Sequence, residues 1–190
     1  MTLGDLLFVT GGVRSGKTSY SEYLAYEFHQ GCNGNLIYLA TSSITDSEMF
    51  ERISRHQKDR NNSALSWVTI EKERDLDEIF HLLNPQDVIV IDCLTTWLSN
   101  EMFSVSTVLN PKNKMIQTIK SILKKSEILI IVSNEISFEW IEPNSLTYSY
   151  CETLGELHTW IVLTCSKAIE MDMGIPIIHK EINFFTTRGG

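Results

Sequence analysis

A glycine-rich octapeptide near the start of the chain limits its fold more than any other feature. Residues 11–18 read Gly-Gly-Val-Arg-Ser-Gly-Lys-Thr, which matches the phosphate-binding pattern G-x-x-x-x-G-K-[ST]. The apolar run 6–9 precedes it and is typical of a buried strand, whereas Tyr20, Leu24 and Phe28 follow it with helical spacing. Strand, loop and helix in this order allow backbone N–H groups and the helix N-terminus to bind phosphate. A chance glycine-rich turn is the alternative, and the flanking pattern argues against it.

The octapeptide therefore predicts a nucleoside triphosphate site with a bound Mg²⁺ ion. Lys17 is expected to reach the outer phosphates, and the Thr18 hydroxyl is expected to hold Mg²⁺. The predicted phosphate-binding residues are Gly11, Gly12, Val13, Arg14, Ser15, Gly16, Lys17 and Thr18.

The bulk properties are those of an acidic globular protein. The chain has 190 residues and a formal net charge of −8, and we expect it to form one domain over residues 1–190. The negative charge argues against general nucleic-acid binding, because a phosphate backbone demands a basic surface. It is compatible with a nucleotide ligand, since a loop can be locally positive on an acidic protein.

Neither a membrane span nor a zinc site is expected. No apolar run approaches the roughly 20 residues that cross a bilayer, and no signal-peptide pattern opens the chain, so we expect a cytoplasmic protein. The four cysteines are widely spaced without a C-x-x-C pair. Cys93 and Cys165 lie in apolar segments and are predicted to be buried.

Apolar runs alternate with amphipathic segments along the chain. Strands are predicted at residues 36–40, 67–70, 88–92 and 128–132, with a last strand at 175–178 at the edge of the sheet because of its proline. Helices are predicted at 17–30, 48–59, 75–83, 95–103 and 112–125, and another within 144–165. The alternation predicts an α/β domain of three layers with a mainly parallel sheet, in which ligands bind at the carboxyl ends of the strands.

Polar side chains follow several of these strands. Asp92 closes the run 88–91, and beside a phosphate loop such a carboxylate is the usual partner of the loop threonine at the metal; a simple helix cap is the alternative. Thr41, Ser42 and Ser43 follow the second strand, and Glu71 ends the third. These residues, and the Asn134-Glu135 pair after the 128–132 run, are either site residues or ordinary turn residues.

A basic stripe is predicted on the helix at 48–59. Arg52, His56 and Arg60 recur every four residues and share one helix face. Two guanidinium groups beside an imidazole form a receptor for polyphosphate, and a neutral imidazole is a nucleophile for group transfer. Spacing alone favours the alternative, which is an exposed charged face with a surface histidine.

Several motifs along the chain are similar to those of a single protein family. The similar segments are Phe-Val-Thr-Gly-Gly-Val-Arg-Ser-Gly-Lys-Thr at 8–18, Tyr-Leu-Ala-Thr-Ser at 38–42, and Glu-Met followed by Arg-Ile-Ser-Arg-His-Gln-Lys-Asp-Arg within 48–60. Trp-Val-Thr-Ile-Glu at 67–71, Asp-Cys-Leu-Thr-Thr-Trp at 92–97 and Val-Ser-Asn-Glu at 132–135 continue the series. In this order they resemble the bifunctional adenosylcobinamide kinase / adenosylcobinamide-phosphate guanylyltransferases of cobalamin assembly, and such a series is far more specific than a phosphate loop alone.

The resemblance implies a RecA-like P-loop domain, assembled as a homotrimer, with two activities. A nucleoside triphosphate, GTP or ATP, phosphorylates the corrinoid adenosylcobinamide. His56 then attacks the α-phosphate of GTP and carries GMP to adenosylcobinamide phosphate. Lys17 and His56 are the implied catalytic residues, and Thr18 and Asp92 the implied metal ligands. The implied nucleotide contacts outside the loop are Thr41, Ser42, Ser43, Gln57, Lys58, Asp59, Arg60, Glu71 and Asp92.

The last third of the chain departs from the family pattern. Residues 137–140 replace a glycine-containing turn, residues 148–152 carry no arginine, 155–159 lack an Asn-Gln pair, and Ser166-Lys167 replaces an acidic pair. These departures leave three alternatives beside the bifunctional enzyme. They are a kinase alone, a guanylyltransferase for another phosphorylated acceptor, and a GTP-binding regulator without corrinoid turnover.

Overall fold

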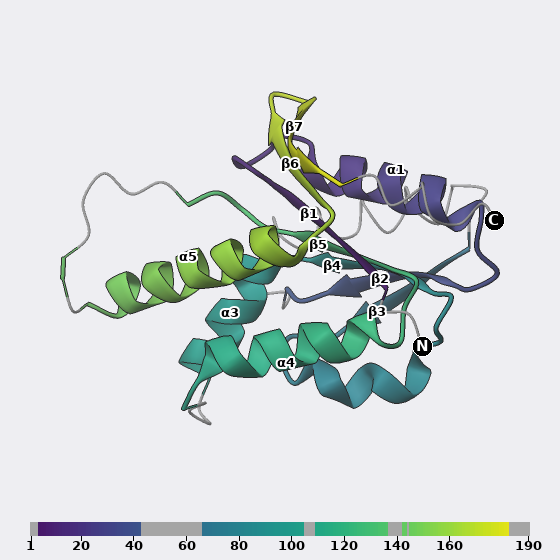
Figure 1. Cartoon of the computed structure of the whole chain (residues 1–190). Helices are drawn as coiled ribbons and strands as arrows, with labels where there is room; N and C mark the ends of the chain where they lie inside the picture. The colour runs from purple at the N-terminus through teal and green to yellow at the C-terminus, as the bar shows by residue number, and fades with distance from the viewer. Residues whose placement is uncertain (1–3, 43–65, 105–108, 137–141, 144, 183–190) are drawn as a thin grey trace, which may run out of the picture.

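The computed structural model describes residues 4–42, 66–104, 109–136, 142–143 and 145–182. These residues form an α/β structure around one seven-stranded sheet (Figure 1). The strands are β1 (Asp5–Gly11), β2 (Leu36–Ala40), β3 (Trp67–Glu71), β4 (Val88–Asp92), β5 (Ile128–Val132), β6 (Lys167–Asp172) and β7 (Ile175–Glu181). Their order across the sheet is β3-β2-β4-β5-β1-β6-β7.

Every neighbouring pair of strands is parallel except β6 and β7, which are antiparallel. The carboxyl ends of six strands therefore lie at one edge of the sheet. β5 lies between β1, which leads into the phosphate loop, and β4, which ends in Asp92. The expected α/β class with a mainly parallel sheet is confirmed.

Helices cover both faces of the sheet and complete three layers (Figure 1). The described helices are α1 (Lys17–His29), the 3₁₀ helix η1 (Leu76–Leu82), α3 (Leu94–Phe103), α4 (Pro111–Leu123) and α5 (Leu146–Thr164). α1 packs on one face, whereas α3, α4, α5 and η1 pack on the other. In the part of the chain that the structure describes, no helix combines the length and apolar character needed to cross a membrane.

Alternation along the strands explains how one sheet supports two cores. In β1, Leu6 and Phe8 join the core under α3, α4 and α5, while Leu7 and Val9 join the core under α1. Successive side chains of a strand point to opposite faces, so a strand covered on both faces must be apolar throughout. The continuous apolar runs that predicted the strands have this origin, and Cys93 and Cys165 are buried as expected.

The structure refines one predicted helix and adds one strand that the sequence did not predict. The segment expected as a helix at 75–83 is the 3₁₀ helix η1, whose two buried residues, Leu76 and Ile79, lie three positions apart. This spacing fits a helix of 3.0 residues per turn, in which positions i and i+3 are eclipsed. The prediction also missed β6, which the chain places between β1 and the correctly predicted edge strand β7.

The turn between β6 and β7 has unusual backbone geometry. Met173 and Gly174 both have positive φ, at 46° and 87°, and they connect the paired residues Asp172 and Ile175. A two-residue hairpin turn with positive φ at both positions favours Asn-Gly, because asparagine tolerates the left-handed region better than other side chains. Met173 is therefore strained, and its side chain is 90% exposed.

Replacing Met173 with asparagine is expected to stabilise the protein. Met173→Asn relieves the left-handed strain and should raise the free energy of unfolding by about 0.5–1 kcal/mol. Thermal unfolding measures the effect, an increase in Tm of roughly 1–4 °C for a chain of this size. Met173→Val is the matched control, and it should lower the Tm because a β-branched residue disfavours positive φ. An equal Tm for both variants contradicts the strain argument.

Candidate nucleotide-binding site

The phosphate loop connects β1 to α1, and its backbone requires glycine at two positions. Gly11 has φ of +146°, and a Cβ atom there would lie 2.3 Å from the carbonyl oxygen of Met171 in the neighbouring strand. Gly16 has φ of 93° and caps the N-terminus of α1. Arg14, between them, also has positive φ, at 59°. This curled backbone directs the loop around the N-terminus of α1, where unpaired N–H groups attract anions.

Lys17 is held inside the loop. Only 7% of its surface is exposed, and its ammonium Nζ donates a hydrogen bond of 2.6 Å to the carbonyl oxygen of Gly12. A longer contact of 3.5 Å joins Nζ to Oγ of Ser15. The positive charge therefore faces the concave side of the loop, which is where phosphate oxygens bind in loops of this type.

Backbone hydrogen bonds support the loop on two sides. The N–H of Glu135, just after β5, donates to the carbonyl oxygen of Gly11 at 2.9 Å. The N–H of Gly174, in the β6–β7 turn, donates to the carbonyl oxygen of Ser15 at 3.0 Å. The β6–β7 hairpin, of which the sequence predicted only one strand, thus contributes directly to the predicted site.

Asp92 and Thr18 come together as the sequence predicts. Oγ1 of Thr18 donates to Oδ2 of Asp92 at 2.8 Å, although the two residues are 74 positions apart. The hydroxyl of Tyr38, in β2, donates to the same carboxylate oxygen at 2.6 Å. Hydroxyl and carboxylate oxygens are the ligands that Mg²⁺ prefers, so this pair fits a magnesium ion bound with a nucleotide.

Thr41 and Ser42 follow β2 on the same edge of the sheet. Thr41 is buried, and its Oγ1 both donates to the carbonyl oxygen and accepts from the N–H of Cys93, at 2.8 Å in each case. Nδ2 of Asn100, in α3, donates to the carbonyl oxygens of Thr41 and Glu73, at 2.9 and 3.0 Å. Thr41 therefore holds the backbone after Asp92, while Asn100 fixes the loops after β2 and β3.

Of the remaining predicted nucleotide contacts, the structure describes Glu71. Glu71 ends β3, in register with Ala40 of β2, which is itself in register with Asp92. Its side chain is exposed at the carboxyl edge. The predicted helix at 48–59 and the residues Ser43, His56, Gln57, Lys58, Asp59 and Arg60 lie outside the described residues.

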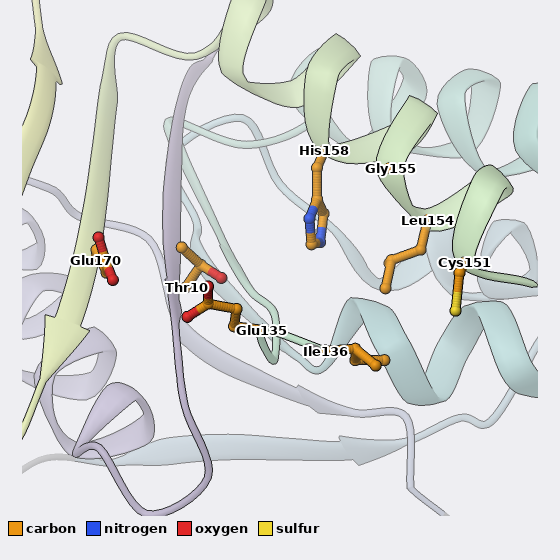
Figure 2. Close-up of a pocket in the computed structure, with 8 residues that line it drawn as sticks. All are labelled: Thr10, Glu135, Ile136, Cys151, Leu154, Gly155, His158 and Glu170. Atoms are coloured by element: carbon orange, nitrogen blue, oxygen red, sulfur yellow. The ribbon is translucent and has the colours of Figure 1, made fainter. Parts of the chain in front are cut away.

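A pocket of about 300 Å³ adjoins the phosphate loop (Figure 2). Its polar wall carries Thr10, Glu135, His158 and Glu170, and its apolar wall carries Ile136, Cys151 and Leu154. In the sequence, His158 has no neighbouring residues that form a recognisable functional motif. The residues around His158 come from three other elements of the chain, so the spacing of residues in the sequence carried no signal for this cluster.

His158 projects from α5 and is partly buried. Its Nε2 lies 2.7 Å from Oγ of the fully buried Ser133, and its ring lies 5.2 Å from that of Phe8. Burial lowers the pKa of His158 below its usual value, because desolvation disfavours the charged imidazolium. The imidazole is therefore neutral at pH 7.

Three further residues shape the site, and only Asn134 among them was a candidate from the sequence. Tyr38 binds Asp92. Asn100 binds the loops after β2 and β3. Nδ2 of Asn134, one of the candidate residues, donates to Oγ1 of Thr95 at 3.1 Å. For Tyr38 the signal existed, because it begins the Tyr-Leu-Ala-Thr-Ser motif at 38–42.

Fold and site together define a P-loop nucleotide-binding protein of the α/β class. The family model described as cobinamide kinase / cobinamide phosphate guanyltransferase matches residues 7–178. The chain belongs to this family. The match extends well past Glu135 and includes the segment in which the family motifs change.

Curated relatives match over nearly their whole length. The chain is 27% identical over 188 residues to the bifunctional adenosylcobalamin biosynthesis protein CobU of Escherichia coli, and 30% identical over 188 residues to that of Salmonella typhimurium. Both alignments cover 92% of this chain and 99% of the relative. The protein CobP of Pseudomonas aeruginosa is 26% identical over 175 residues, which is 90% of this chain and 95% of CobP.

A solved structure also matches, although too distantly to support an argument. The flagellar accessory protein FlaH from Methanocaldococcus jannaschii superposes with a TM-score of 0.49 and 20% identity. The match covers 95% of this chain and 80% of FlaH.

The lowered pKa of His158 predicts a pH-dependent stability. The unfolded chain, with a histidine pKa near 6.5, binds a proton more readily than the folded chain. The stability that the neutral His158 contributes to the folded state is therefore complete above about pH 6.5, and it is lost as the pH falls towards the folded-state pKa. His158→Gln should flatten the dependence of the unfolding free energy on pH between about 5 and 7.

Urea unfolding at pH 5.5 and 7.5 checks the prediction for the wild type and the variant. The pKa of Asp75 is lowered mainly by its hydrogen bond from Lys114, so that group changes stability only at more acidic pH, below about 4. Equal pH dependence in the two proteins contradicts the assignment to His158.

Proposed function

We propose that this protein phosphorylates adenosylcobinamide and then transfers GMP from GTP to adenosylcobinamide phosphate. The observation that carries the proposal is the phosphate loop with Lys17 inside it and the Thr18–Asp92 pair beside it, in a chain of the cobinamide kinase / cobinamide phosphate guanyltransferase family. The names of the three curated relatives, all bifunctional adenosylcobalamin biosynthesis proteins, support the same activities.

In the kinase step, the loop holds the triphosphate, and Lys17 binds its outer phosphate oxygens. Thr18 and Asp92 would hold Mg²⁺, because both offer oxygen ligands and their oxygens lie 2.8 Å apart. A bound Mg²⁺ supplies charge neutralisation on the phosphates. Tyr38, through its hydrogen bond to Asp92, keeps that carboxylate oriented towards Thr18.

In the transferase step, we assign His56 as the nucleophile. A neutral ring nitrogen attacks the α-phosphorus of GTP, the bond to the bridging oxygen breaks, and pyrophosphate leaves with the electron pair. The resulting phosphoramidate transfers GMP when a phosphate oxygen of the acceptor displaces the histidine nitrogen. The motif around His56 in residues 48–60 supports this role, and Ser43, Gln57, Lys58, Asp59 and Arg60 are assigned to nucleotide binding with it.

The position of Glu71 suits the nucleoside rather than the phosphates. β3 lies two strands beyond β4, and neighbouring strands are about 4.8 Å apart, so Glu71 lies roughly 10 Å across the sheet from Asp92. Thr41 and Ser42 lie between them, after β2. We therefore assign Glu71 to the ribose or the base, where a carboxylate accepts hydrogen bonds from hydroxyl or amino groups.

A guanylyltransferase for a different phosphorylated acceptor is the second candidate. It is favoured by the changed motifs after Glu135, because that segment includes the whole of α5. A kinase without transferase activity would leave adenosylcobinamide phosphate as its final product, and a GTP-binding regulator would form no product. Product analysis with adenosylcobinamide and with its phosphate, each as sole acceptor, distinguishes these activities.

His56 is expected to be the only residue that carries GMP. After incubation with α-labelled GTP, the wild type should hold a label that is stable in base and labile in acid, and mass spectrometry should locate it at His56. His56→Ala should reduce the label to background while nucleotide affinity changes by less than about twofold. Lys17→Ala is the contrast, and it should lower both activities by roughly 100-fold or more, as expected for loss of a phosphate-stabilising charge.

Two results contradict these assignments. Absence of label on a wild-type protein that turns over a kinase substrate refutes the transferase activity. Equal loss of labelling and nucleotide binding in His56→Ala refutes a purely nucleophilic role for His56.

A further inference from the structure

The pocket beside the phosphate loop shares its wall with the loop itself. Thr10 immediately precedes Gly11, and Glu135 is tied to Gly11 by the backbone hydrogen bond of 2.9 Å. Thr10 follows Leu6 and Phe8 on the face of β1 that is covered by α5, so the pocket opens on that side of the sheet. A molecule in the pocket would therefore lie next to the first residues that contact phosphate.

The two ends of the pocket differ in chemistry (Figure 2). Glu135 and Thr10 lie close together at one end, with Glu170 on β6 beyond them, whereas Ile136, Leu154 and Cys151 form the other end. His158 descends from α5 between the two. The burial-lowered pKa of His158 leaves that ring uncharged at neutral pH, so carboxylates dominate the charge of the polar end.

Among the described residues, only one acidic or basic side chain of the pocket has its functional group unengaged. Glu170 Oε2 lies 2.6 Å from Nε2 of His179, and Nε2 of His158 lies 2.7 Å from Oγ of Ser133. No described residue forms a hydrogen bond or ion pair with the carboxylate of Glu135, and that side chain is exposed to the pocket. Glu135 can therefore accept a proton from a bound molecule.

We propose that this pocket binds the hydroxyl-bearing arm of the kinase acceptor and that Glu135 is the general base for phosphorylation. The inference rests on the proposed kinase activity. The alcohol oxygen attacks the γ-phosphorus, and its proton passes to the carboxylate of Glu135. The new O–P bond forms as the bond between the γ-phosphorus and the β,γ-bridging oxygen breaks, and the nucleoside diphosphate leaves with the electron pair.

The charge of the pocket also selects between the two acceptors of the proposed function. An alcohol arm brings no negative charge to the unengaged carboxylate of Glu135, whereas a phosphate monoester is a dianion near neutral pH and is repelled by it. The pocket therefore serves the kinase step, and its phosphorylated product is driven out rather than retained. The apolar end at Ile136 and Leu154 accommodates the carbon chain of the arm.

Glu135→Gln tests the base directly, because glutamine keeps the shape and removes the proton acceptor. With adenosylcobinamide and ATP or GTP, kcat for phosphorylation should fall by about 10²- to 10⁴-fold, while KM for the nucleotide changes little. GMP uptake from α-labelled GTP should remain at the wild-type level, which shows that the loop is intact. Glu142→Gln, an exposed glutamate outside the pocket, is the matched control and should retain wild-type kinetics.

The outcomes separate this inference from the proposed function. If the wild type phosphorylates no alcohol acceptor, the kinase half of the proposed function fails, and the inference fails with it. If the wild type is active and Glu135→Gln is equally active, only the role of Glu135 is overturned. Parallel loss of phosphorylation and GMP uptake in Glu135→Gln also overturns it, because the effect then comes from the loop.

Gly155, in the wall of the pocket, offers an independent test of where the acceptor binds. A Cβ atom there meets nothing within 4 Å, and a residue other than glycine is favourable in a helix interior, so larger side chains are compatible with folding. Gly155→Phe should raise KM for the acceptor at least about tenfold and leave KM for the nucleotide unchanged. Gly155→Ala is the control, with KM near the wild-type value; an unchanged acceptor KM in Gly155→Phe excludes the pocket as the acceptor site.

Discussion

The hydrogen bond from the N–H of Glu135 to the carbonyl oxygen of Gly11 fixes the point where the sheet becomes the phosphate loop. Gly11 is confined on its other side by Met171, whose carbonyl oxygen leaves no room for a Cβ atom. The start of the loop is thus held between the strand ends of β5 and β6. Its far side is held by Gly174, which donates to Ser15. Because Gly11, Gly12 and Gly16 carry no side chain, the shape of the loop depends in large part on these backbone contacts.

The same constraint brings the polar groups of the site together. Parallel strands end at one edge of the sheet, so Asp92 at the end of β4, Thr41 after β2 and Asn134 after β5 lie at the same edge as the loop. Their hydrogen bonds link the strand ends to one another: Thr41 binds the backbone of Cys93, and Asn134 binds Thr95. Each of these polar groups therefore has a partner within the protein, and the chain's own contacts organise the site.

The sequence predicted the parts of this arrangement that are encoded locally. The continuous apolar runs at 88–92 and 128–132 coincide with β4 and β5, because strands covered on both faces must be apolar at every position. The loop and Asp92 followed from a motif and its distance along the chain. β6 was missed because Lys167, Glu170 and Asp172 interrupt its apolar residues. The helix at η1 was predicted but not its 3₁₀ type, because an i, i+3 pair of apolar residues fits both kinds of helix.

Long-range contacts explain what the sequence could not predict at the site. His158 was unremarkable as a sequence position, and only the packing of α5 against β1 places it near Ser133 and Glu170. Likewise, the partners of Asn100 are 59 and 27 residues away. Patterns with period 2 or 3.6 report which face a residue occupies and not which distant residue it meets. The motif around His56 likewise indicates a chemical role, but it does not indicate where that imidazole lies relative to the loop.

One loop can serve two group transfers only if the two nucleophiles reach different phosphorus atoms. An alcohol that attacks the γ-phosphorus releases a nucleoside diphosphate, whereas a histidine that attacks the α-phosphorus releases pyrophosphate. In-line displacement requires each nucleophile to approach opposite its own leaving group, so the two paths enter the site from different directions. The pocket at Glu135 lies at the strand end next to Gly11, while Glu71, the proposed nucleoside contact, lies on β3 at the far edge of the sheet. Under the proposed assignments, this separation gives the γ- and α-phosphorus atoms distinct surroundings, so that one binding loop supports both reactions.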